Sequence, residues 1–114
     1  EITLAGPTRA ALWDGQAVTQ LTLTPESVGI GIANADQLAG GDAAHNAGII
    51  TDVLGGTTGP CADIVRLNAG ASLWISEAAP TLQEGVDTAT QLMRSGAPLE
   101  ILQKLASLTT ELAS

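Results

Sequence analysis

Aromatic residues are scarce in this chain of 114 residues, which has no Phe, no Tyr and only two Trp. The core must therefore be built from Leu, Ile, Val and Ala. Cysteine is nearly absent too, and the single Cys61 excludes an internal disulfide or a cysteine-rich metal site. This usage suits a reducing compartment, so we expect a cytoplasmic protein. The apolar runs are too short to predict a membrane-spanning segment.

Basic residues are also few. Four Lys and Arg face twelve Asp and Glu, for a formal net charge of −8 at pH 7. Nucleic-acid binding relies on Lys and Arg to neutralise phosphates, and anionic membranes repel an acidic chain, so we expect neither partner. A phosphorylated small molecule stays compatible with this charge if a metal cation mediates its binding. The alternative is that the charge serves only to keep the domain soluble.

The length of the chain and the pattern of its residues predict one α/β domain. Hydrophobic residues make up 45% of the chain, and its length suits a single domain. Residues 1–24 are expected to hold a short strand at Ile2–Leu4 and then a hairpin. The two arms of the hairpin flank Asp14-Gly15, which is a signal for a two-residue turn. Residues 28–41 carry four glycines and predict a loop with one short helical turn.

Residues 42–114 predict a packed set of about four helices. Asp42 is a good cap for the first helix, and Thr81–Glu84 forms a capping box for the third. The second and fourth helices open near Pro60 and Pro98, because proline is tolerated at a first helical position. Short connections predict that neighbouring helices pack together. The apolar stripes at helical spacing are Ala43, Ala47, Ile50 and Leu54; Ile64, Leu67, Ala71 and Trp74; Val86, Ala89 and Met93; and Ile101, Leu105, Leu108 and Leu112.

Few side chains could carry chemistry. Asp42 and His45 lie three residues apart and share a helix face, but the chain has no second histidine. A surface or capping role is therefore favoured for His45 over metal binding. Cys61 lies in the first turn of its predicted helix, where the helix dipole would lower the pKa of a thiol. No histidine is near it in sequence, so the role of a small buried apolar residue is favoured.

Two polar features have both a structural and a ligand-binding interpretation. Gly40-Gly41 precedes a predicted helix and could cradle a phosphate, but it lacks the Lys and Ser or Thr of a P-loop. The carboxylate of Asp42 would also repel a phosphate, so helix capping is favoured. Asn68 lies inside the second predicted helix, although asparagine is a poor helix former. A clamp on a neighbouring backbone segment is favoured over a ligand contact.

Several stretches together resemble the anthranilate phosphoribosyltransferases, in order along nearly the whole chain. Glu1–Thr8 is similar to a segment that follows an Asp in that family. The later matching stretches are Leu38–Asp42, Asn46-Ala47, Val53-Leu54, Gly59-Pro60, Asp63–Val65, Leu67–Ala69, Leu82 with Glu84-Gly85, and Ser95-Gly96. The resemblance implies that residues 1–114 are the C-terminal part of a larger α/β domain of the phosphoribosyltransferase and nucleoside phosphorylase type.

The resemblance also implies a function in tryptophan biosynthesis. Such enzymes transfer phosphoribosyl from phosphoribosyl pyrophosphate to the amine of anthranilate, with magnesium. Glu1 matches a family glutamate that ligates a Mg²⁺ ion on the diphosphate, and a carboxylate is a suitable hard donor for Mg²⁺. The competing interpretation is an exposed terminal glutamate. The partner Asp, the phosphate loop and the anthranilate-contacting residues would all lie upstream, so no catalytic or substrate-binding residue is assigned.

The chain begins at Glu1, in the middle of an expected strand, so we expect a piece of a longer polypeptide. The resemblance implies an upstream segment or companion chain, a homodimer formed through a separate helical domain, and no activity in the 114 residues alone. Two alternatives stay open. One is a non-catalytic relative that binds a nucleotide or a protein partner, and the other is a relative of the pyrimidine-nucleoside phosphorylases.

Overall fold

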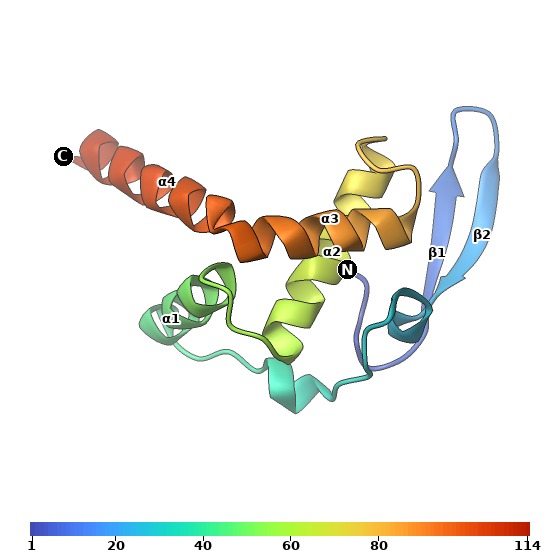
Figure 1. The fold of residues 1–114 in the computed structure, drawn as a ribbon, viewed down its shortest axis with the longest axis horizontal. Helices are drawn as coiled ribbons and strands as arrows, with labels where there is room; N and C mark the ends of the chain where they lie inside the picture. The colour runs from blue at the N-terminus through green and yellow to red at the C-terminus, as the bar shows by residue number, and fades with distance from the viewer.

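The computed structural model describes all 114 residues, Glu1 to Ser114. A β-hairpin comes first, two 3-10 turns follow, and four α-helices complete the chain (Figure 1). This order confirms the predicted hairpin followed by four helices. The elements are β1 (Thr8–Trp13), β2 (Val18–Leu23), η1 (Pro25–Val28), η2 (Ala35–Leu38), α1 (Ala43–Leu54), α2 (Pro60–Ile75), α3 (Leu82–Ser95) and α4 (Ala97–Ala113).

The hairpin loop is longer than predicted. β1 and β2 pair antiparallel with Trp13 opposite Val18, so the loop holds the four residues between them and not two. Asp14 explains the difference. Its Oδ1 accepts hydrogen bonds from the backbone N–H groups of Gln16 and Ala17, both at 2.8 Å, and these bonds stabilise a wider turn.

The strand predicted at Ile2–Leu4 does not form. Leu4 is nevertheless fully buried, and the backbone of this segment bonds to distant parts of the chain. The Ile2 N–H donates to Asn68 Oδ1 at 2.9 Å, and the Ala33 N–H donates to the Leu4 carbonyl at 3.0 Å. The apolar side chains therefore enter the core by docking on α2 and on the loop after the hairpin, without joining a sheet.

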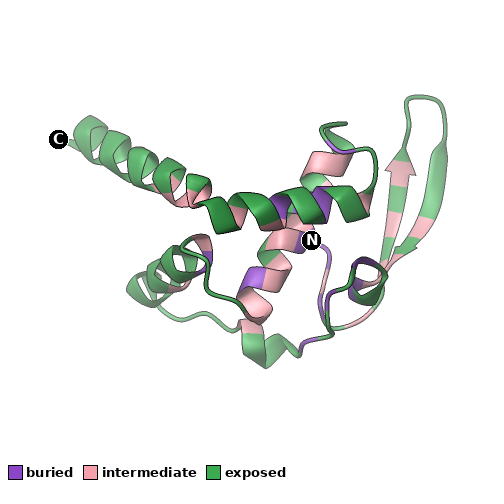
Figure 2. Cartoon of the chain, in the orientation of Figure 1, coloured by how far each residue is buried: buried purple, intermediate pink, exposed green.

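The hydrophobic core lies where this segment and the loop meet the crossing of α2 and α3 (Figure 2). At that crossing the two helices touch backbone to backbone. A Cβ on Gly70 would lie 2.5 Å from the Val86 nitrogen, and a Cβ on Gly85 would collide with the Gly70 carbonyl oxygen. Only glycine at both positions permits so close an approach. The buried core residues are Ile2, Leu4, Val28, Ile30, Ala33, Leu67 and Val86.

The outer helices leave apolar side chains exposed. In α1 only Val53 is buried, while Ile50 of the predicted stripe is 49% exposed. α4 buries no residue and projects away from the other helices (Figure 1). The prediction that neighbouring helices pack together therefore holds well for α2 and α3, but only for the first turns of α4. None of the helices combines the length and the hydropathy needed to cross a bilayer.

Candidate functional site

Glu1, the expected magnesium ligand, is exposed at the start of the chain. It lines an open cavity of about 630 Å³ between the N-terminal segment, β1 and α2, where Arg9 is the only other charged side chain. No three His, Cys, Asp or Glu side chains of the chain lie close enough together to hold a metal ion. Mg²⁺ is commonly bound through one or two carboxylates together with phosphate oxygens and water. Glu1 offers one carboxylate, so an ion held there would take its other donors from a phosphorylated ligand and water.

The backbone next to Glu1 is held by Asn68 of α2. The Ile2 N–H donates to Asn68 Oδ1 at 2.9 Å, and Asn68 Nδ2 donates to the Ile2 carbonyl at 3.0 Å. The same Nδ2 donates to the Ile64 carbonyl at 3.1 Å, so both ends of the amide are used within the chain. This confirms the predicted backbone clamp. Because Ile2 directly follows Glu1, the clamp also fixes the point from which the Glu1 side chain projects.

The polar backbone groups of Gly41, in the Gly40-Gly41 turn, already form hydrogen bonds within the chain. Asp42 Oδ1 accepts from the His45 N–H at 2.8 Å and caps α1, as predicted. Asn46 Oδ1 accepts from the Gly41 N–H at 2.8 Å, and its Nδ2 donates to the Gly41 carbonyl at 3.2 Å. The Gly41 amide is therefore already used. Sequence reasoning missed this second asparagine clamp, whose signal is an Asn in the first turn of a helix that follows a glycine pair.

Neither His45 nor Cys61 belongs to a group of three or more side chains that could hold a metal ion. The His45 side chain is exposed, in agreement with the predicted surface role. Cys61 is half-buried, and its thiol contacts the Gln37 carbonyl at 3.7 Å. This contact ties the start of α2 to η2, so the role of the cysteine is structural, but the residue is half-buried and not the buried apolar residue that was predicted.

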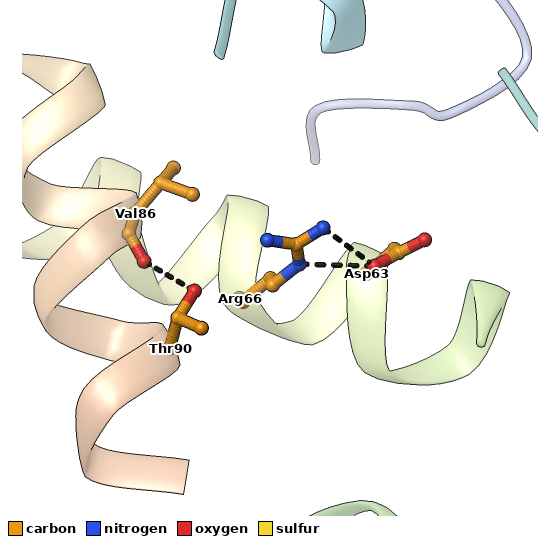
Figure 3. Close-up of polar contacts among 4 residues, drawn as sticks. All are labelled: Asp63, Arg66, Val86 and Thr90. Carbon is orange, nitrogen blue, oxygen red and sulfur yellow. Dashed lines mark hydrogen bonds and ion pairs between the residues drawn. The ribbon is translucent and has the colours of Figure 1, made fainter. Parts of the chain in front are cut away.

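A second polar cluster was not found from the sequence. Asp63 and Arg66 lie one turn apart on α2, and both Nε and Nη2 of Arg66 approach Asp63 Oδ1 at 2.9 Å (Figure 3). Opposite them on α3, the Thr90 hydroxyl donates to the Val86 carbonyl at 2.7 Å. Together with Arg94 these side chains line a cavity of about 280 Å³. The available signal was the i, i+3 spacing of opposite charges.

Comparisons with known proteins give a consistent result. The chain is 42% identical over 109 residues to an anthranilate phosphoribosyltransferase of Mesorhizobium japonicum, which is 96% of this chain and 32% of that protein. It is 45% identical over 109 residues to that of Trichlorobacter lovleyi, covering 96% and 31%. The crystal structure of anthranilate phosphoribosyltransferase from Thermus thermophilus matches with a TM-score of 0.82 and 35% identity, covering 91% of this chain and 31% of that one.

The resemblance predicted from the sequence motifs is thus confirmed by sequence and by fold. The chain spans about a third of the length of the curated relatives that it matches. Residues 1–99 match the family described as glycosyl transferase family, a/b domain. Since that match covers most of the 114 residues, the chain belongs to this glycosyl transferase family.

Proposed function

We propose that the chain contributes to an anthranilate phosphoribosyltransferase of tryptophan biosynthesis. The complete enzyme would transfer phosphoribosyl from phosphoribosyl pyrophosphate to the amine of anthranilate. The observation that supports this proposal is the similarity to enzymes of that name, which extends over 91% or more of the chain in both sequence and fold. The acidic charge of −8 is compatible with an anionic substrate because a metal cation can mediate between the two.

The proposed contribution of this chain to the active site is the carboxylate of Glu1. It would hold Mg²⁺ against the diphosphate of the substrate, and the ion would neutralise charge that develops on the leaving group. Asn68 would act as a positioning residue, because its amide brackets the backbone beside Glu1. The helices behind would support this arrangement without touching the substrate.

We further propose that the 114 residues alone transfer nothing. Their relatives are about three times as long, and the remaining two-thirds would supply the other binding groups. An upstream segment or a companion chain would carry them, and a homodimer would form through that part. Transfer chemistry depends on holding two substrates in register, which one carboxylate cannot do.

A chimera tests this proposal. The 114 residues replace the matching third of the Mesorhizobium japonicum relative, and turnover that requires both anthranilate and phosphoribosyl pyrophosphate is measured. We expect turnover in the chimera and none in the isolated chain. The variant Glu1→Gln should need more Mg²⁺ for half-maximal rate, whereas Glu111→Gln, at the exposed end of α4, should behave as the parent. A chimera that folds but shows no turnover would instead support a non-catalytic relative.

A further inference from the structure

The Arg66 cavity lies apart from the proposed magnesium ligand. It is bounded by the end of α1, the loop before α2, the start of α2 and the end of α3. It shares no lining residue with the cavity at Glu1. On α2 it is lined by Ala62 and Arg66, whereas the other cavity is lined by Asn68 and Ala71, about half a helical turn away. The two cavities therefore open on different faces of the same helix.

The charge of this cavity is opposite to the charge of the chain. Arg66 and Arg94 both line it, and they are two of only four basic residues against twelve acidic ones. The only acidic side chain in the lining is Asp63. The local balance is thus positive in a chain whose formal net charge is −8. Solubility does not explain why half of the basic residues gather at one cavity.

The guanidinium of Arg66 is held in a fixed orientation. Asp63 Oδ1 lies 2.9 Å from both Nε and Nη2 of Arg66. The side chain of Arg66 is 25% exposed and that of Asp63 is 27% exposed. Figure 3 shows the remaining terminal nitrogen directed away from Asp63. Arg94 is exposed in the last turn of α3 and forms no ion pair. One preoriented and one free guanidinium therefore line the same space, and guanidinium groups match the oxygens of phosphate well.

The remaining polar residues of the lining differ in whether they can donate a hydrogen bond to an anion. The Thr90 hydroxyl hydrogen is already donated to the Val86 carbonyl, so this group offers only its oxygen. Thr57 and Thr58, in the exposed loop before α2, add two further hydroxyl groups. Donors to an anion would thus come from the two arginines and this loop. The apolar side chains of Val53, Ala62 and Met93 form the rest of the wall.

We propose that this cavity binds a phosphate group, either as inorganic phosphate or as a small phosphate monoester. Its volume of about 280 Å³ is just below the ~300 Å³ at which pockets for drug-sized ligands begin, so a dinucleotide would not fit. The proposal is independent of the proposed function, because it uses neither Glu1 nor a magnesium ion.

Titration of the ¹⁵N-labelled chain followed by NMR tests the proposal. Inorganic phosphate, glycerol 3-phosphate and acetate are added separately at constant ionic strength. We expect saturable shifts of the amide signals of Thr57 and Thr58 with both phosphates and none with acetate. Tighter binding of glycerol 3-phosphate would identify a monoester as the ligand, and tighter binding of inorganic phosphate would identify free phosphate. Equal affinities would show that the site recognises the phosphate group alone. Shifts that do not saturate, or that acetate reproduces, would overturn the proposal.

Charge variants decide whether the arginines are responsible. Arg94→Gln should weaken phosphate binding by about tenfold, which corresponds to the loss of one charge-assisted hydrogen bond. Arg66→Gln should do the same. Lys104→Gln, on α4 outside the cavity, removes the same charge and should change affinity by less than about twofold, as expected for a screened distant charge.

A non-specific attraction would make the three variants equal and would refute the site. Arg66→Gln also leaves Asp63 without its partner, so unfolding is measured for every variant. Arg94 has no ion pair to lose, and its variant keeps the test valid if Arg66→Gln is unstable. Unchanged phosphate affinity in a folded Arg94→Gln variant would therefore exclude the proposed role of that arginine.

Discussion

Helices α1 and α2 contain the same kinds of residues but use them differently. Each has a glycine inside the helix, Gly48 and Gly70, and each has an asparagine whose amide brackets a backbone segment, Asn46 and Asn68. In α1 these residues face open space or the adjacent turn, while in α2 they contact segments far away in sequence. The comparison shows that residue type alone does not indicate how much a position contributes to stability, because the contribution depends on what lies opposite.

The glycine pair should give the largest difference between the two helices. In Gly70→Ala the new Cβ would lie 2.5 Å from the Val86 nitrogen, so α2 and α3 must separate. We expect a loss of about 3 kcal/mol in the free energy of unfolding, at the upper end of overpacking costs. Gly48→Ala has nothing within 4 Å of the new Cβ, and it should stabilise the chain by about 0.5–1 kcal/mol.

Urea unfolding of the two variants measures this difference directly. The signs should be opposite, because one methyl group meets backbone and the other only removes the flexibility of glycine. Equal, small effects would mean that α2 and α3 are not in backbone contact at Gly70. The prediction would also be contradicted if Gly48→Ala were the more destabilising change.

The asparagine pair should give a smaller difference of the same kind. Asn68→Ala removes the partners of the partly buried Ile2 N–H and carbonyl, and we expect a loss of about 1–3 kcal/mol in unfolding free energy. Asn46→Ala removes hydrogen bonds at an exposed turn, where water can replace them. Its cost should stay at about 1 kcal/mol or less.

Hydrogen exchange tells a local effect from a global one. The Ile2 amide should exchange faster in Asn68→Ala than the amides at the centre of α2, because the N-terminal segment loses its attachment to the helix. In Asn46→Ala the same amide should keep its parental protection. An Ile2 amide that stays protected in Asn68→Ala would show that burial of Leu4, and not the amide clamp, holds the segment.

The sequence predicted those structural features that depend only on residues close together in the chain. The caps at Asp42 and Thr81 were predicted correctly because the side chain and the amide that it accepts from are three residues apart. At Thr81 only this half of the predicted capping box forms, because the Glu84 side chain does not bond back to the Thr81 N–H. The clamp by Asn68 was predicted because an amide on an apolar helix face needs partners. The segment held by the clamp lies 66 residues away in sequence, and no local pattern indicates it.

The wrong and missing predictions have the same cause. Ile2–Leu4 shows the apolar alternation of a strand, but burial against α2 and the loop satisfies the same pattern. The cavity at Arg66 and Arg94 exists only because α2 and α3 cross, and the crossing depends on a contact between two distant glycines. Glu1 was selected by the family resemblance alone, since a single carboxylate has no distinguishing local pattern.

The hairpin loop extends the comparison to a region that contributes nothing to the core, and it should give the smallest effect. The N–H groups of Ala17 and then Gln16 donate to the Asp14 carboxylate and hold its pKa below the ordinary value of 3.8. A lowered pKa in the folded state adds stability that is present above 3.8 and is lost as the pH falls through the lowered pKa. Because Asp14 is fully exposed, this loss should stay within the loop and leave the core unchanged.

Titration of the carboxyl groups followed by NMR checks this expectation. Asp14 should titrate with a pKa below 3.8, while the methyl signals of the buried Leu67 should not change as Asp14 takes up its proton. Asp14→Asn keeps an acceptor oxygen for the two backbone N–H groups but has no proton to bind, so it should abolish the pH dependence of the loop signals. An Asp14 that titrates at or above 3.8 would contradict the hydrogen bonds that widen the loop.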